Sequence, residues 1–124
     1  MKTSAHAPPD LRERTFRFAI RVVKLCRHLE AKNGVPRVLA RQLLRSGTSI
    51  GANVEEAQAA QSRADFVNKN AIALKEARET HYWLRLLQAS GELPEHVAEG
   101  LQQESGELMR ILGAVVVSAR KEKK

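Results

Sequence analysis

The sequence predicts an all-α fold, an antiparallel up-down-up-down four-helix bundle formed by a single domain of 124 residues. Apolar residues recur at helical spacing along four segments, glycine and proline gather between them, and no segment alternates like a β-strand. Helices of roughly 20 to 27 residues would span about 30 to 40 Å at 1.5 Å per residue. The short links between them place successive helices antiparallel.

The first helix is expected over residues 10–32, after a flexible arm at residues 1–9 that ends in two prolines. Asp10 is placed to cap it. Its apolar stripe comprises Phe18, Val22, Leu25, Cys26 and Leu29. Another face carries a basic row at steps of three and four residues, namely Arg14, Arg17, Arg21, Lys24 and His28. No carboxylate lies within this row, so it is either a solvated face or one turned toward an anionic partner.

The second helix is expected over residues 36–61, because Asn33-Gly34 forms a turn and Pro36 suits a first helical turn. It opens with a second basic row, Arg37, Arg41 and Arg45. Further along, one face is apolar and small, with Leu43, Gly47, Ile50, Val54 and Ala57. Glycine within a helix costs about 1 kcal/mol relative to alanine. Close approach of a neighbouring backbone is therefore the expected reason for Gly47 and Gly51.

The third helix is expected over residues 63–89, where Ser62 with Asp65 gives an N-terminal cap and Ser90-Gly91 a stop. Near its end, Tyr82 and Trp83 are interpreted as a cap on the core rather than as a base-stacking platform, because other aromatic residues are scarce. The fourth helix, over residues 94–119, begins at Pro94 and is acidic. Residues 120–124 form a charged tail.

A polar row lies beside the small apolar face of the second helix. It comprises Ser46, Ser49, Asn53 and Glu56, and the antiparallel third helix offers Lys75, Glu76 and Glu79 opposite it. Buried polar groups need partners. The hypothesis is therefore a structural polar network formed by Ser49, Asn53, Glu56, Lys75, Glu76 and Glu79 that fixes the register of the two helices.

Composition excludes several classes of function. One cysteine rules out an internal disulfide framework, and no apolar run approaches the roughly 20 residues that span a bilayer. The four histidines are scattered, without metal-ligand spacing, and no phosphate-binding glycine loop occurs. We therefore expect a cytoplasmic protein that is not an enzyme, with no catalytic residues, metal, cofactor, membrane partner or small-molecule substrate.

The run RSGTSIGANVEEA, followed by SRADF, ALKEARET and YWLRLL, resembles the four-helix-bundle family of the large-subunit (23S) ribosomal RNA intervening-sequence proteins. The accessory variability determinant of diversity-generating retroelements is related to that family. The resemblance covers roughly residues 12 to 117 and is densest between Arg45 and Leu87, while Asn70 departs from it at a position that is more often apolar. It implies a homo-oligomeric ring of five subunits, nucleic-acid binding and a reverse transcriptase as a protein partner.

Two hypotheses of function follow from the charge distribution. The net charge of +7 is concentrated up to Arg45, where eleven Lys and Arg face three acids. In the first hypothesis, this basic surface binds RNA or DNA through phosphates, and the candidate residues are Arg14, Arg17, Arg21, Lys24, Arg37, Arg41 and Arg45. In the alternative, the protein is an interaction and assembly module whose basic rows pair with acidic surfaces, such as the fourth helix of the same or another subunit.

Overall fold

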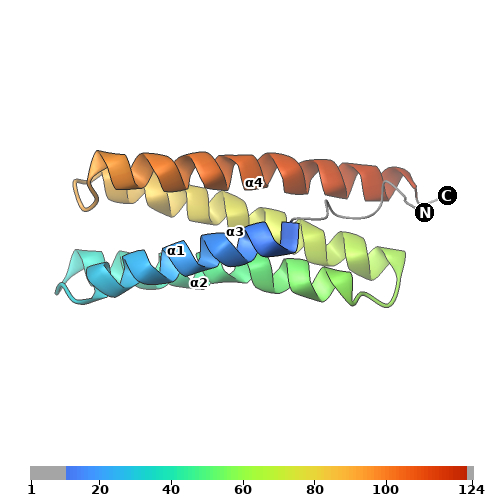
Figure 1. Cartoon of the computed structure of the whole chain (residues 1–124), viewed down its shortest axis with the longest axis horizontal. Coiled ribbons are helices and arrows are strands. Elements are labelled where there is room, and N and C mark those ends of the chain that lie inside the picture. Colours follow the sequence, from blue (N-terminus) through green and yellow to red (C-terminus); the bar gives the residue numbers. More distant parts are fainter. Residues whose placement is uncertain (1–10, 123–124) are drawn as a thin grey trace.

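The computed structural model describes residues 11–122, which form four helices: α1 (Leu11–Glu30), α2 (Val35–Gln58), α3 (Arg63–Ala89) and α4 (Glu95–Lys121). Successive helices run antiparallel, with loops 31–34 and 90–94 at one end and loop 59–62 at the other (Figure 1). The predicted all-α four-helix fold is confirmed. The predicted arm at residues 1–9, the Asp10 cap and residues 123–124 of the tail lie outside the described part of the chain.

Local chemistry sets the ends of these helices. Gly34 and Gly91 adopt φ of 83° and 86°, a left-handed conformation that glycine accepts without strain. The Ser62 side chain accepts a hydrogen bond of 3.0 Å from the backbone N–H of Asp65, as the capping signal predicted. α2 ends at Gln58, before the predicted residue 61, because the N–H groups of Ala59 and Ala60 bond three residues back and tighten the chain toward that cap.

α1 lies close against the glycines of α2. A Cβ placed on Gly47 would lie 2.8 Å from Cγ1 of Val22, and one on Gly51 would lie 3.4 Å from the carbonyl oxygen of Thr15. Real Cβ atoms do not approach as closely as the first distance, so a side chain at Gly47 would push α1 away. The small residues of α2 therefore explain how tightly the two helices pack.

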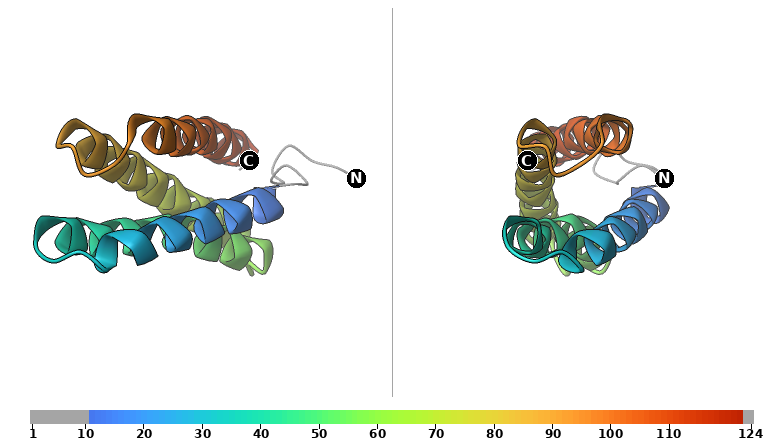
Figure 2. Two further views of the ribbon diagram at one scale, coloured as in Figure 1. Left: turned by 60° about the vertical axis from the view of Figure 1, so that its left-hand side comes forward. Right: turned by 90° about the vertical axis from the view of Figure 1, so that its left-hand side faces the viewer.

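One side of the bundle is open. α1 packs on α2, α2 on α3 and α3 on α4, but α1 and α4 make few contacts and diverge along their length (Figure 2). A groove of about 430 Å³ lies between them, with a floor of Leu25, Val97 and Leu101. Arg21, Lys24, His28 and His96 line the same groove. Part of the basic row of α1 is therefore turned toward this groove.

Asn70 is one of the buried polar residues of the bundle. Its side chain is fully buried on α3, and its Nδ2 donates to the carbonyl oxygen of Phe66 at 3.0 Å. Its Oδ1 has no hydrogen-bond partner among the described residues. The departure from an apolar residue at this position thus leaves a buried acceptor unsatisfied, which costs stability.

Candidate nucleic-acid interface

Arg14 is held by the acidic face of α4. Its Nε donates to Glu104 Oε2 at 2.7 Å, one Nη donates to Glu104 Oε1 at 2.9 Å, and the same guanidinium bonds Glu107. The hydrogen bond that Glu107 accepts from Arg14 lowers the pKa of the Glu107 carboxyl, and the hydrogen bonds that Arg14 donates to the two glutamates raise the pKa of Arg14. Arg14 thus links α1 to α4 within one subunit, and this contact takes it out of the predicted anion-binding set.

Three more of the predicted basic residues, on α1 and α2, also have partners within the chain. Arg17 pairs with Glu13 at 3.0 Å, one helical turn earlier on α1. Arg41 pairs with the Glu30 carboxylate at 3.3 Å, while Arg37 donates to the Glu30 carbonyl oxygen at 3.1 Å and keeps its charge unneutralised. Exposed pairs such as those of Arg17 and Arg41 are weak and can exchange for a phosphate.

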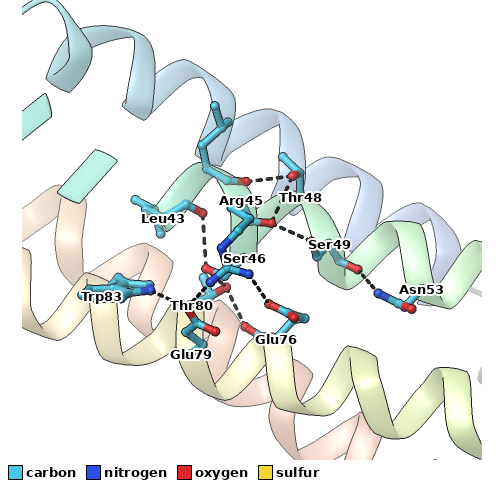
Figure 3. A network of polar contacts seen from close by, with 11 residues as sticks. Leu43, Arg45, Ser46, Thr48, Ser49, Asn53, Glu76, Glu79, Thr80 and Trp83 are labelled. Carbon is cyan, nitrogen blue, oxygen red and sulfur yellow. Dashed lines mark hydrogen bonds and ion pairs between the residues drawn. The ribbon is translucent and has the colours of Figure 1, made fainter. Parts of the chain in front are cut away.

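Arg45, the last of the predicted basic residues, belongs to the contact between α2 and α3. Its guanidinium bonds Glu79 and lies 3.4 Å from Glu76 Oε1 (Figure 3). The Trp83 indole N–H also donates to Glu79, at 3.0 Å, and the hydroxyls of Ser46 and Thr80 lie 2.9 Å apart in the buried seam. The polar seam between these helices is therefore built on Arg45, Ser46 and Thr80.

The predicted polar network is correct for only part of its residues. Glu76 and Glu79 do connect α3 to α2, but Ser49 and Asn53 bond backbone carbonyls of their own helix, at 2.7 and 2.9 Å (Figure 3). Glu56 and Lys75 are exposed, and within residues 11–122 neither side chain has a hydrogen bond or ion pair, so the prediction was wrong for them. The sequence pattern placed the row on the correct side of α2, but it could not show that a long arginine would reach the carboxylates first.

One group of cations without an ion pair lies on the second half of α1 and in the loop after it. Arg21, Lys24, Arg27 and Lys32 are exposed, and none of them forms an ion pair with a carboxylate of the described residues. Sequence analysis had not singled out Arg27 and Lys32, because they lie off the straight row. Counting which cations lack an acid four residues away would have indicated them. With Arg37, they form what we call the free basic surface.

His81 joins α3 to α4. Its Nδ1 lies 2.8 Å from Oγ of Ser105, whose hydroxyl in turn donates to the carbonyl oxygen of Gln102. Partial burial, with a smaller contribution from Arg85, lowers the pKa of His81 below its ordinary value. His81 and Ser105 therefore form a side-chain hydrogen bond between α3 and α4.

Protonation of His81 should make stability depend on pH. Because its folded-state pKa is lowered, the contribution is fully present above the unfolded value of 6.5 and is lost as pH falls through the folded pKa. We expect the urea midpoint to fall between about pH 7 and 5, and His81→Gln to reduce this fall. His96→Gln, at an exposed histidine, is the matched control. If the urea midpoint of His81→Gln fell with pH as much as that of the wild type, His81 would not be the group responsible.

The thiol of Cys26 is buried where α1 packs on α2. Burial, with a smaller effect of Glu30, raises the pKa of the Cys26 thiol to about 12, and the thiol donates to the carbonyl oxygen of Ala40. In the part of the chain that the structure describes, no cluster of three or more His, Cys, Asp or Glu could hold a metal ion. None of the four described helices is long and apolar enough to cross a membrane.

Comparison with known proteins identifies relatives of this fold. Residues 10–114 match the family described as 23S rRNA-intervening sequence protein. The chain is also similar to a protein of unknown function from the S23 ribosomal protein family of Bacteroides thetaiotaomicron VPI-5482, whose crystal structure was solved at 1.70 Å. The two are 42% identical with a TM-score of 0.79, over 86% of this chain and 97% of that one. A search of curated proteins found no match.

Proposed function

Because the chain belongs to the 23S rRNA-intervening sequence protein family, we propose that it is a non-enzymatic module that binds RNA or DNA through phosphate contacts. The observation that carries this proposal is the free basic surface, where Arg21, Lys24, Arg27 and Lys32 are exposed and form no ion pair with a carboxylate of the described chain. Cations left unpaired on one surface repel each other, and phosphates relieve that repulsion.

The dimensions of this surface suit a nucleic-acid backbone. From Arg21 to the end of α1 the helix rises about 14 Å, a length over which one strand of a duplex presents about four phosphates. The exposed pairs of Arg17 and Arg41 border this surface and can add further contacts. Binding of this kind follows charge and backbone shape, and it carries little information about base sequence.

The first test is fluorescence anisotropy with labelled duplex DNA and with a structured RNA at low salt. We expect both to bind, because the contacts are made to phosphates that both ligands possess. Failure of either to bind at about 50 mM salt would contradict the proposal, since phosphate contacts are strongest there.

Self-association is the second candidate, and it is favoured by exposed apolar residues on α1. The side chains of Phe16 and Ile20 are 59% and 39% exposed and lie one helical turn apart. Aromatic and aliphatic residues in contact on a surface are typical of subunit interfaces. The ring of five subunits suggested by the resemblance would repeat the free basic surface around one assembly, a suitable platform for a nucleic-acid enzyme such as a reverse transcriptase.

The double variant Phe16→Ser with Ile20→Ser should be monomeric if this face is the subunit contact. Removing most of the apolar area that an interface would bury should weaken association at least tenfold, which light scattering measures as a shift in mass. Val117→Ser, an equally exposed apolar residue on α4, is the control. An unchanged mass in the double variant would exclude this face as the contact.

A further inference from the structure

Tyr82 lies on the outer surface of α3, where sequence analysis had expected it to cap the core. Its side chain is 51% exposed, between Arg78 one turn before it and Arg85 one turn after it. Both arginines are exposed, and neither forms an ion pair with a carboxylate of residues 11–122. An aromatic ring thus stands between two free cations on a surface separate from the free basic surface of α1.

The ring of Tyr82 is held in place by the polar seam between α2 and α3. It makes an edge-to-face contact with Trp83, with ring centroids 5.2 Å apart. The Trp83 indole bonds Glu79, which in turn bonds Arg45 of α2 (Figure 3). This chain of contacts fixes an exposed side chain, so a ligand that stacks on Tyr82 loses less entropy on binding.

A shallow pocket lies beside Tyr82, along the line where α3 meets α4. Its volume of about 340 Å³ lies at the lower end of the roughly 300–1,000 Å³ of small-molecule sites. Arg85, Gln88 and Gln102 line it together with Tyr82. Gln102 Nε2 donates to Gln88 Oε1 at 2.7 Å. That bond leaves the side-chain oxygen Oε1 of Gln102 and the side-chain amino group Nε2 of Gln88 without another partner among the described residues.

We infer that Tyr82 and this pocket bind one unpaired nucleotide of a single-stranded nucleic acid. The base stacks on Tyr82, Arg78 and Arg85 contact the flanking phosphates, and the free amide groups of Gln88 and Gln102 meet the edge of the base. A neighbouring acceptor and amino donor complement these amide groups, and adenine presents that pair on its N7 and N6 edge. The inference rests on the proposed nucleic-acid binding and adds to it a preference for unpaired adenine.

The test measures the affinity of Tyr82→Ala for a labelled oligoadenylate of about ten nucleotides and for a duplex of the same length. We expect oligoadenylate binding to weaken about tenfold, because a stacked base contributes 1–3 kcal/mol, and duplex binding to stay unchanged. Tyr82→Phe keeps the ring and should bind both ligands like the wild type. The single tryptophan lies next to Tyr82. Its fluorescence should be quenched by oligoadenylate in the wild type and much less in Tyr82→Ala.

The outcomes separate this inference from the proposed function. If wild-type protein binds both ligands and Tyr82→Ala binds each of them as tightly as the wild type does, the nucleotide site is wrong and phosphate binding stands. If wild-type protein binds neither ligand, the proposed function fails and this inference fails with it. A change in the mass of Tyr82→Ala by light scattering would instead make Tyr82 a subunit contact and overturn the inference.

Discussion

Reversing two charges on α1, in the double variant Arg21→Glu with Lys24→Glu, should weaken nucleic-acid binding roughly 100-fold at low salt. Each cation lost removes about one phosphate contact, and each glutamate adds repulsion at the same place. Both side chains are exposed and line the open groove without a carboxylate partner in the described chain, so the fold does not depend on their charge. Anisotropy with duplex DNA and with structured RNA should give similar losses.

Arg110→Glu with Arg120→Glu is the matched control for this variant. Both arginines are exposed on α4, so the reversal changes the net charge by the same amount at a different surface. Its affinity should fall much less, by the general effect of net charge alone. Equal losses in the two double variants would show that binding depends on total charge and would contradict an interface on α1.

The same pair of variants distinguishes the two functions that the charge distribution suggested. If the free basic surface contacts phosphates, Arg21→Glu with Lys24→Glu should keep the wild-type mass in light scattering. If that surface instead pairs with the acidic α4 of another subunit, the variant should dissociate. Arg14 already makes such a contact inside one subunit, with Glu104 and Glu107.

A side chain at Gly47 should destabilise the bundle more than any other substitution considered for the core. Gly47→Leu should lose about 3 kcal/mol of unfolding free energy, because its Cβ alone would lie 2.8 Å from Val22, a stiff and fully buried residue. Gly47→Ala should lose about 1 kcal/mol, since the gain in helix propensity offsets part of the overlap. Urea unfolding followed by circular dichroism measures both.

Gly113→Ala on α4 should have the opposite effect to a substitution at Gly47 and raise the free energy of unfolding. Apart from its chain neighbours and the backbone of its own helix, no atom lies within 4 Å of a Cβ placed there, so the substitution should stabilise the bundle by about 0.5–1 kcal/mol through helix propensity. In addition, Val22→Ala should reduce the cost of Gly47→Ala, because it removes the two methyl groups that the new Cβ would meet. A Gly47→Ala variant as stable as the wild type would disprove the close contact between α1 and α2.

The helices and the core could be predicted from sequence because local signals agree with each other. Gly34, Ser62 and Gly91 mark helix ends by their own backbone and side-chain chemistry, and the apolar face of α2 became the buried face. Helical periodicity depends only on neighbours along the chain, so it survives without knowledge of the packing.

The site could be predicted less well, because pairing across helices depends on distances that the sequence does not contain. Arg14 and Arg45 belonged to the basic rows, but each reaches two carboxylates of another helix. Tyr82 and Trp83 are adjacent in sequence, but only Trp83 turns toward the polar seam while Tyr82 faces outward. Side-chain length and the rotation of each helix about its axis decide these outcomes.

The most direct test of the account is the salt dependence of nucleic-acid binding by the wild-type protein. The five cations of the free basic surface predict that the logarithm of the binding constant for duplex DNA falls linearly with the logarithm of salt concentration, with a slope of about −4.5 per bound subunit. In Arg21→Glu with Lys24→Glu the slope should be shallower by about 2. A binding constant that does not change with salt, or a slope unaffected by the two reversals, would contradict phosphate binding by this surface.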